Sequence, residues 1–202
     1  MNSTNTRTQI LDTAQELIQR LGVNAMSYQD ISVAVGIRKA SIHHHFPTKD
    51  DLLAALLDRY NDYFLRLVDS IIAMPIPADE KLRRYCALFE ATLNSGNQDK
   101  ACLYGMVGAE LATLKNPLIE RVAAFYRDNE ERLVAILDEG RKTGVFGFAG
   151  DVKAMATLIF SLLEGGILIV RASGGVEQYQ AVIEQLMQLV IGVKKSASRG
   201  EC

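Results

Sequence analysis

The 202-residue sequence predicts an all-α protein, with an N-terminal three-helix domain joined to a helical bundle and about nine helices in total. Apolar residues recur every three or four positions along most of the chain, which is the spacing of one helix face. Glycine, proline, serine and asparagine separate these periodic segments. No segment alternates apolar and polar residues for long enough to predict a strand, since residues 145–148 are too few and too rich in glycine.

The first 50 residues carry the signals of three helices. The first helix is amphipathic and should end near Gly22; its apolar positions are Ile10, Leu11, Ala14, Leu17, Ile18 and Leu21. Ser27 and Asp30 have the spacing of a capping box, which predicts a short helix over 28–35 that ends at Gly36. A second short helix is expected from about 38 to 45, before Phe46 and Pro47.

The remaining residues, 51–202, are expected to form the helical bundle. Thr48 and the acidic residues after it predict the start of a long helix that ends before the Pro75–Pro77 segment. This helix crosses the boundary between the two expected domains, 1–50 and 51–202, and so links them stiffly. Further helices are expected at about 79–93, 101–114, 117–143, 151–172 and 176–193, with a break at 95–97.

Composition excludes several classes of protein. Hydrophobic residues make up 49% and charged residues 23% of the chain, as in a globular protein rather than a disordered one. The odd cysteine count (Cys86, Cys102 and Cys202) fits no secreted disulfide framework, and the polar N-terminus favours a cytoplasmic protein. The apolar run between Lys153 and Arg171 contains Glu164 and is short for a membrane span, so we expect a buried helix and no membrane partner.

The sequence has no sign of a catalytic or cofactor site. It contains no nucleophile elbow, zinc-protease motif, phosphate-binding loop or dinucleotide fingerprint, so we expect neither an enzyme nor a cofactor. Consecutive histidines at 43–45 point about 100° apart on a helix, so they cannot readily converge on one metal ion.

The two short helices around Gly36, preceded by a longer one, predict a helix-turn-helix whose second short helix enters the major groove of DNA. Arg38, Lys39 and Ser41 are the candidates for base edges, whereas Ser27 and Lys49 stand at helix N-termini suited to phosphates. The full set of candidate DNA-binding residues is Ser27, Arg38, Lys39, Ala40, Ser41, His43, His44 and Lys49. The overall charge of −2 hides a difference, because residues 1–50 carry +1 and residues 51–202 carry −3.

Residues 8–53 resemble the DNA-binding domain of the TetR/AcrR family of one-component transcriptional regulators. From position 36 the chain reads GIRKASIHHHFPTKDDL, and the family pattern is roughly GVSKGTLYYHFxSKEEL. The matching positions are Lys39, His45, Phe46, Lys49 and Leu52, with conservative matches at Ile37, Ser41, Ile42 and Thr48. Arg38 replaces a small N-cap, Ala40 replaces glycine, and His43 and His44 replace two tyrosines that usually touch the DNA backbone. Since imidazole changes charge near neutral pH, operator affinity is hypothesised to vary between about pH 6 and 8.

The end of the chain predicts a dimer. From Val176 to Val193, apolar residues are spaced 3, 4, 3, 4, 3 as in a heptad repeat. The expected interface residues are Leu162, Gly166, Val170, Tyr179, Ile183, Leu186 and Val190. A wholly intramolecular bundle is the alternative. The resemblance also implies a homodimer through the last two helices, and a palindromic operator requires two helix-turn-helix copies about 34–36 Å apart.

The resemblance further implies a pocket for a small-molecule effector in the middle of the chain. Its candidate lining residues are Tyr85, Phe89, Cys102, Met106, Phe125, Tyr126 and Phe160, each of which can instead belong to the core. Glu110 and Glu164 lie in apolar surroundings, where each is expected to pair with an arginine rather than meet a cationic ligand.

These features predict a homodimeric repressor that a small molecule releases from a palindromic operator. The alternative is a thiol-based sensor of electrophiles or oxidants, because a helix N-terminus and nearby Lys100 are expected to lower the pKa of Cys102. A helical interaction module that binds no DNA also remains open. The effector, the operator sequence and the regulated genes do not follow from the sequence.

Overall fold

The computed structural model describes residues 3–93, 99–173 and 175–192. Within these residues the chain forms nine α-helices and one 3₁₀ turn, with no strand, which confirms the all-α prediction. The α-helices are α1 (Ser3–Leu21), α2 (Tyr28–Val35), α3 (Lys39–His45), α4 (Lys49–Ile72), α5 (Ala78–Glu90), α6 (Leu103–Ala109), α7 (Asn116–Lys142), α8 (Val152–Ser173) and α9 (Val176–Ile191), and the 3₁₀ turn is Leu111–Thr113. The expected break at 95–97, Val193 and Cys202 lie outside the described residues.

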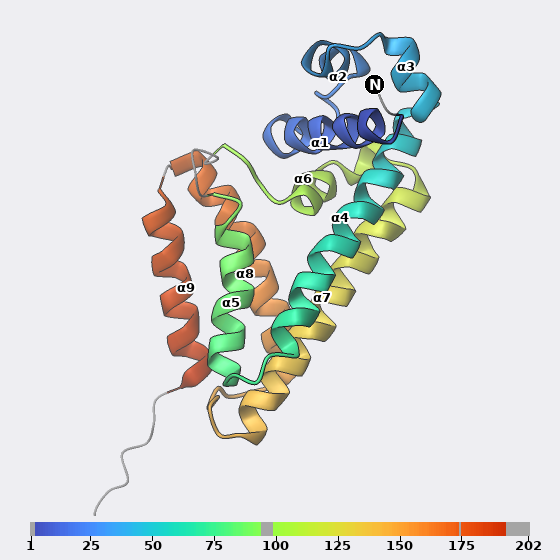
Figure 1. Ribbon diagram of the computed structural model, residues 1–202. Helices are drawn as coiled ribbons and strands as arrows, with labels where there is room; N and C mark the ends of the chain where they lie inside the picture. The colour runs from blue at the N-terminus through green and yellow to red at the C-terminus, as the bar shows by residue number, and fades with distance from the viewer. Residues whose placement is uncertain (1–2, 94–98, 174, 193–202) are drawn as a thin grey trace, which may run out of the picture.

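The helices form two groups joined by long helices (Figure 1). Helices α1, α2 and α3 lie at one end of α4, while α5, α8 and α9 lie side by side in the body. The most extensive packing is that of α7 against α4 and α8. Helix α6 lies beneath α1 and packs against both α1 and α7, so it is placed between the two groups.

Local hydrogen bonds set the starts of α2 and α4. The Ser27 hydroxyl accepts from the Asp30 amide, and the Asp30 carboxylate accepts from the Ser27 amide at 2.9 Å. Thr48 and Asp51 form the same reciprocal pair before α4. Helix α2 ends at Gly36, whose φ of 73° is a left-handed conformation that favours glycine. The predicted caps therefore lie where the sequence indicates.

The buried apolar residues form one continuous core. Ile10, Ile31 and Ile42 are fully buried where α1, α2 and α3 meet, and Leu52 on α4 is equally buried. In the body, rings from α4, α5, α7 and α8 extend this core. Because the core has no break at the end of α3, a displacement of α4 would be transmitted to the helix-turn-helix.

Helix α8 is long and apolar enough to cross a membrane, judged by length and composition alone. In the fold it packs against α5, α7 and α9. Gly166 permits a close approach of α9, since a Cβ there would lie 2.9 Å from the Tyr179 ring, whose hydroxyl donates to the Leu163 carbonyl at 3.0 Å. One side of the helix therefore belongs to the core of the bundle, while its other side is exposed.

The expected dimer residues require revision, because most of them are buried inside the single chain. Of the seven, Leu162 is half-buried; the buried ones are Gly166, Val170, Tyr179, Ile183, Leu186 and Val190. The heptad spacing on α9 reflects packing against α5 and α8 of the same chain, so the intramolecular alternative accounts for these residues. The large apolar side chains exposed on α8 and α9 are a different set: Leu158, Leu168, Ile169 and Leu189.

Candidate nucleic-acid interface and effector site

Helix α3 presents a polar and basic face to solvent. Arg38 is the N-cap and makes no side-chain cap hydrogen bond, so its guanidinium is not used to begin the helix. Five of the expected DNA-binding residues on this segment are exposed: Arg38, Lys39, Ala40, His43 and His44. Ser41 is half-buried. On the opposite side, Ile42 and Phe46 are buried in the core. The helix is therefore fixed by its apolar side while its polar side is free for contact.

A surface hollow lies between α2 and α3 and brings together four of the expected DNA-binding residues. Ser27, Lys39, His43 and Lys49 line it, together with Asn24, Met26, Tyr28 and Gln29. The hollow therefore joins the start of α2 to the exposed side of α3. This juxtaposition of a helix N-terminus with a lysine and a histidine suits the phosphate groups of DNA.

Tyr28 fixes α2 relative to the α3–α4 connection, a role that sequence reasoning missed. Its hydroxyl donates toward the carbonyl oxygens of Phe46, at 2.9 Å, and Thr48, at 2.6 Å. Its ring lies 4.9 Å from that of His43, whose Nδ1 is 3.2 Å from the Pro47 carbonyl oxygen. Burial raises the pKa of Tyr28 to about 12, so the hydroxyl remains a donor at neutral pH.

Lys49 has a structural role that the sequence reading did not foresee. Its ammonium donates to the carbonyl oxygens of Val23, at 2.6 Å, and Met26, at 2.7 Å. Two of its three N–H groups therefore bind the α1–α2 connection instead of pointing to solvent. Burial lowers the pKa of Lys49, and the charges of Glu110 and Asp50 oppose that effect.

The end of α1 is hydrogen-bonded to the segment that leads into α6. The Ala101 amide donates to the Gln19 carbonyl at 3.0 Å, and the Gln19 side-chain amide donates to the Ala101 carbonyl at 3.1 Å. Lys100 forms an ion pair with Glu16, and Asp99 forms one with Arg20. The segment that precedes α6 is therefore joined to the DNA-binding end of the molecule.

The end of α6 contacts the α1–α2 connection as well. The Glu110 carboxylate accepts from the Asn24 amide at 2.7 Å. This contact replaces the arginine pairing expected for Glu110. From α8, Arg171 donates to the Arg20 carbonyl and lies 3.2 Å from the Met106 sulfur. Both ends of α6 are therefore positioned to transmit movement to the helix-turn-helix.

The expected pocket residues form one packed aromatic cluster. Tyr85, Phe89, Cys102, Phe125 and Phe160 are buried, while Met106 and Tyr126 are half-buried. The cluster is continuous, since ring centroids are 5.4 Å apart for Tyr85 and Phe89, 6.1 Å for Phe89 and Phe160, and 5.5 Å for Tyr126 and Phe160. The structure brings these residues together, but as core packing rather than as the walls of an open pocket.

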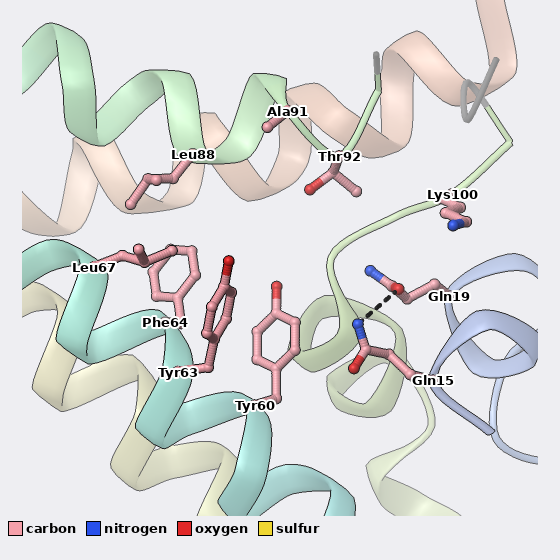
Figure 2. Close-up of a pocket in the computed structure, with 10 residues that line it drawn as sticks. All are labelled: Gln15, Gln19, Tyr60, Tyr63, Phe64, Leu67, Leu88, Ala91, Thr92 and Lys100. Carbon is pink, nitrogen blue, oxygen red and sulfur yellow. Dashed lines mark hydrogen bonds between the residues drawn. The ribbon is translucent and has the colours of Figure 1, made fainter. Parts of the chain in front are cut away.

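A cleft of about 300 Å³ opens beside this cluster, between α1, α4 and α5 (Figure 2). It is lined by Gln15, Gln19, Tyr60, Tyr63, Phe64, Leu67, Leu88, Ala91, Thr92 and Lys100. The Tyr60 and Phe64 rings stack at 6.0 Å, and Phe64 lies 5.6 Å from Phe125, so the cleft borders the aromatic cluster directly. Sequence reasoning missed this lining because the helical spacing of Tyr60, Phe64 and Leu67 is also that of core residues.

Cys102 does not have the electrostatic environment expected of a reactive thiol. It is 3% exposed, and Lys100 forms its ion pair with Glu16. Burial raises the pKa of the thiol well above its usual value, and the adjacent Glu164 adds to the rise. The backbone amides of Gly105 and Tyr104 oppose this less strongly. The direction is the reverse of the predicted one, because burial outweighs the helix N-terminus.

Comparison with known proteins decides the family. Residues 10–56 match the model for bacterial regulatory proteins of the tetR family, and residues 78–186 match the tetracyclin repressor-like C-terminal domain. The chain belongs to the TetR family. A TetR-family regulator from Agrobacterium tumefaciens has a TM-score of 0.89 and 30% identity, covering 94% of this chain and 99% of that one. A TetR regulator from Legionella pneumophila has a TM-score of 0.82 and 32% identity, with 94% and 100% covered.

A curated relative of similar length is named as a repressor. The HTH-type transcriptional repressor KstR2 of Mycobacterium tuberculosis is 25% identical over 187 residues, which are 92% of this chain and 91% of that protein. This TetR-family chain is a DNA-binding transcriptional repressor and not an enzyme. The helix-turn-helix at its N-terminus supplies the DNA-binding surface.

Proposed function

We propose that this TetR-family repressor is a cytoplasmic homodimer that a small-molecule effector releases from a palindromic operator. The observation that carries the proposal is the exposed Arg38–His44 face of α3, held by buried Ile42 and Phe46. The DNA-binding part is assigned to residues 1–50 and the effector-binding and dimerisation part to residues 51–202. Two copies of α3 would occupy successive major grooves about 34–36 Å apart.

The contacts of α6 support a route from effector to operator. An effector in the cleft or in the adjacent aromatic cluster would displace α6 or α4. Helix α6 would then pull on the end of α1 through Ala101 and Gln19, and on the α1–α2 connection through Glu110 and Asn24. Release follows if the effector binds the displaced arrangement more tightly than the operator-bound one.

Replacing Arg38 and Lys39 together with alanine is expected to lower operator affinity about 100-fold, since each cation contributes roughly 1–3 kcal/mol to a base or phosphate contact. The operator is first selected from random duplex DNA with the wild-type protein, and binding is then measured by fluorescence anisotropy. The slope of affinity against salt concentration should also decrease.

The matched control removes two exposed cations from the body, Arg127 and Lys153, which lie on α7 and α8. This double variant should bind the operator as the wild type does. Equal losses in both double variants, with folding intact by circular dichroism, would contradict the assignment of α3 as the DNA-binding helix.

We propose that the dimer forms through the exposed apolar side of α8 and α9, which carries Leu158, Leu168, Ile169 and Leu189. Ile169 is the most exposed of these residues, at 61%. On α8, Gly165 lies between Leu158 and Ile169 in the sequence and has open space beside it, which permits close approach of a second helix. Apolar groups on a two-fold axis meet their own copies.

Replacing Ile169 with glutamate is expected to raise the dimer dissociation constant at least about 100-fold, because each dimer would bury two like charges. Sedimentation equilibrium measures the change. The same substitution at Leu21, which is 57% exposed on α1, is the control and should leave the association state unchanged. A dimer that persists in the Ile169→Glu variant would exclude this interface.

A further inference from the structure

Glu164 has a buried carboxyl group with an unused acceptor. It lies on α8, and its Oε1 is buried without a hydrogen-bond partner. A Cβ at Gly105 would stand 2.7 Å from Oε2, so the carboxyl is pressed against the start of α6, where the Cys102 thiol also donates to it. A buried carboxylate is costly unless a cation or several donors satisfy it.

The protein supplies no cation to this carboxyl among the described residues. The charge of Glu164 raises the pKa of titratable groups on the neighbouring elements, namely Tyr60 on α4, Tyr85 on α5, Cys102 before α6, Tyr126 on α7 and Tyr179 on α9. All are hydroxyls or thiols.

The nearby cations are occupied elsewhere. Arg171 on α8 donates to the Arg20 carbonyl, and Lys100 pairs with Glu16. The arginine pairing predicted for Glu164 is therefore absent from the described part of the chain.

Aromatic rings surround this carboxyl and reach the cleft. Tyr60 lines the cleft, and its pKa is raised by burial and by the charges of the neighbouring Cys102 and Glu164. Tyr60 is therefore shared by the cleft and the surroundings of Glu164. Figure 2 shows the Tyr60 and Tyr63 rings side by side on α4, at the edge of the cleft. Aromatic faces attract cations, and more strongly so when water is excluded.

We propose that Glu164 binds the ammonium group of a small organic amine whose apolar body occupies the cleft beside Tyr60 and Phe64. The cleft volume of about 300 Å³ is at the lower end of the range for ligand pockets, which favours a small amine over a large one. The proposal rests on the proposed function and adds the chemical class of the effector. Seated at Glu164, the amine would displace the Cys102 thiol and with it the start of α6.

The binding of an amine should depend on pH with a definite sign. Burial raises the pKa of Glu164 to about 7, and the hydrogen bond from Cys102 opposes this effect only in part. The ammonium requires the carboxylate, so protonation of Glu164 below pH 7 competes with binding. Amine affinity should therefore fall about tenfold from pH 8 to pH 6.

The test uses three probes with the same ring, namely 2-phenylethylamine, neutral 2-phenylethanol and anionic 3-phenylpropionate. Calorimetry measures binding to the full-length protein without DNA, and anisotropy measures release of the selected operator. The amine should bind and release DNA, while the alcohol and the acid should bind at least about tenfold more weakly. Equal binding of the three probes, or no binding of the amine, would overturn the proposal.

Glu164→Gln keeps the shape of the side chain and removes its charge. We expect this variant to bind 2-phenylethylamine about 10- to 100-fold more weakly, without the pH dependence, and to bind the operator as the wild type does. Glu131→Gln, at an exposed carboxylate on α7, is the control and should bind the amine normally. Unchanged amine affinity in Glu164→Gln would overturn the proposal.

A failure of the proposed function can be distinguished from a failure of the amine proposal. If the wild type bound no operator in the absence of probes, the helix-turn-helix assignment would be at fault. A protein that binds its operator but ignores the amine would leave that assignment intact and exclude only the amine.

Discussion

Replacing Lys49 with alanine is expected to lower the free energy of unfolding by roughly 3 kcal/mol, because two charge-assisted hydrogen bonds are lost and two carbonyl groups are left without donors. These carbonyls belong to Val23 and Met26, residues that are only 2% and 1% exposed, so water replaces the ammonium poorly. Urea unfolding followed by circular dichroism at pH 7 measures the change.

Lys39→Ala is the matched control, since Lys39 begins α3 and is exposed. Its removal should change the free energy of unfolding by less than about 0.5 kcal/mol while weakening operator binding. The two substitutions therefore distinguish a lysine that stabilises the fold from a lysine that binds DNA. If Lys49→Ala unfolded at the wild-type urea concentration and only weakened operator binding, Lys49 would be a phosphate ligand as the sequence first indicated.

The sequence predicted the helix-turn-helix well because its signals are local. The Ser27–Asp30 and Thr48–Asp51 pairs need only a three-residue spacing to cap a helix, and the structure has both capping boxes. Gly36 likewise ends α2 through its own backbone conformation. Such features are the same whatever lies elsewhere in the chain.

Contacts between distant segments could not be predicted in this way. The periodicity of α9 showed that Tyr179 and Ile183 share an apolar face, but not that α5 and α8 of the same chain cover it. For Cys102 the sequence indicates only the helix N-terminus and nearby Lys100, whereas the pKa of the thiol depends on burial beside Glu164. Spacing identifies a face, and only the fold decides what covers it.

The same limit explains the errors at the effector site. Tyr60 and Phe64 have the spacing of core residues, and the cleft beside them exists only because α1 and α5 stand apart at that point. The arginine partner predicted for Glu164 is not supplied by Arg171, which lies in the last turn of the same helix. In the fold, Arg171 instead reaches Arg20 on α1.

Glu164 should make the protein less stable as the pH rises, and Glu164→Gln should remove this effect. Burial raises the pKa of Glu164 in the folded protein from its usual 4.5 to about 7. Below pH 4.5 the carboxyl is protonated in both the folded and the unfolded protein, so it does not lower the free energy of unfolding. Between these values the unfolded chain ionises first. The free energy of unfolding therefore falls by roughly 3 kcal/mol up to pH 7 and then stays level.

Other groups also titrate over this range, so the measurement is the difference between wild type and Glu164→Gln in urea unfolding at pH 4.5, 6, 7 and 8. The variant should gain stability relative to the wild type with rising pH, up to roughly 3 kcal/mol at pH 8. A flat difference would mean that the carboxyl is satisfied in the folded protein. If the difference in free energy of unfolding rises with pH, the repressor without ligand contains an unpaired carboxylate that lowers its stability. Such a cost is expected at a ligand-binding site, where function rather than stability determines the residue.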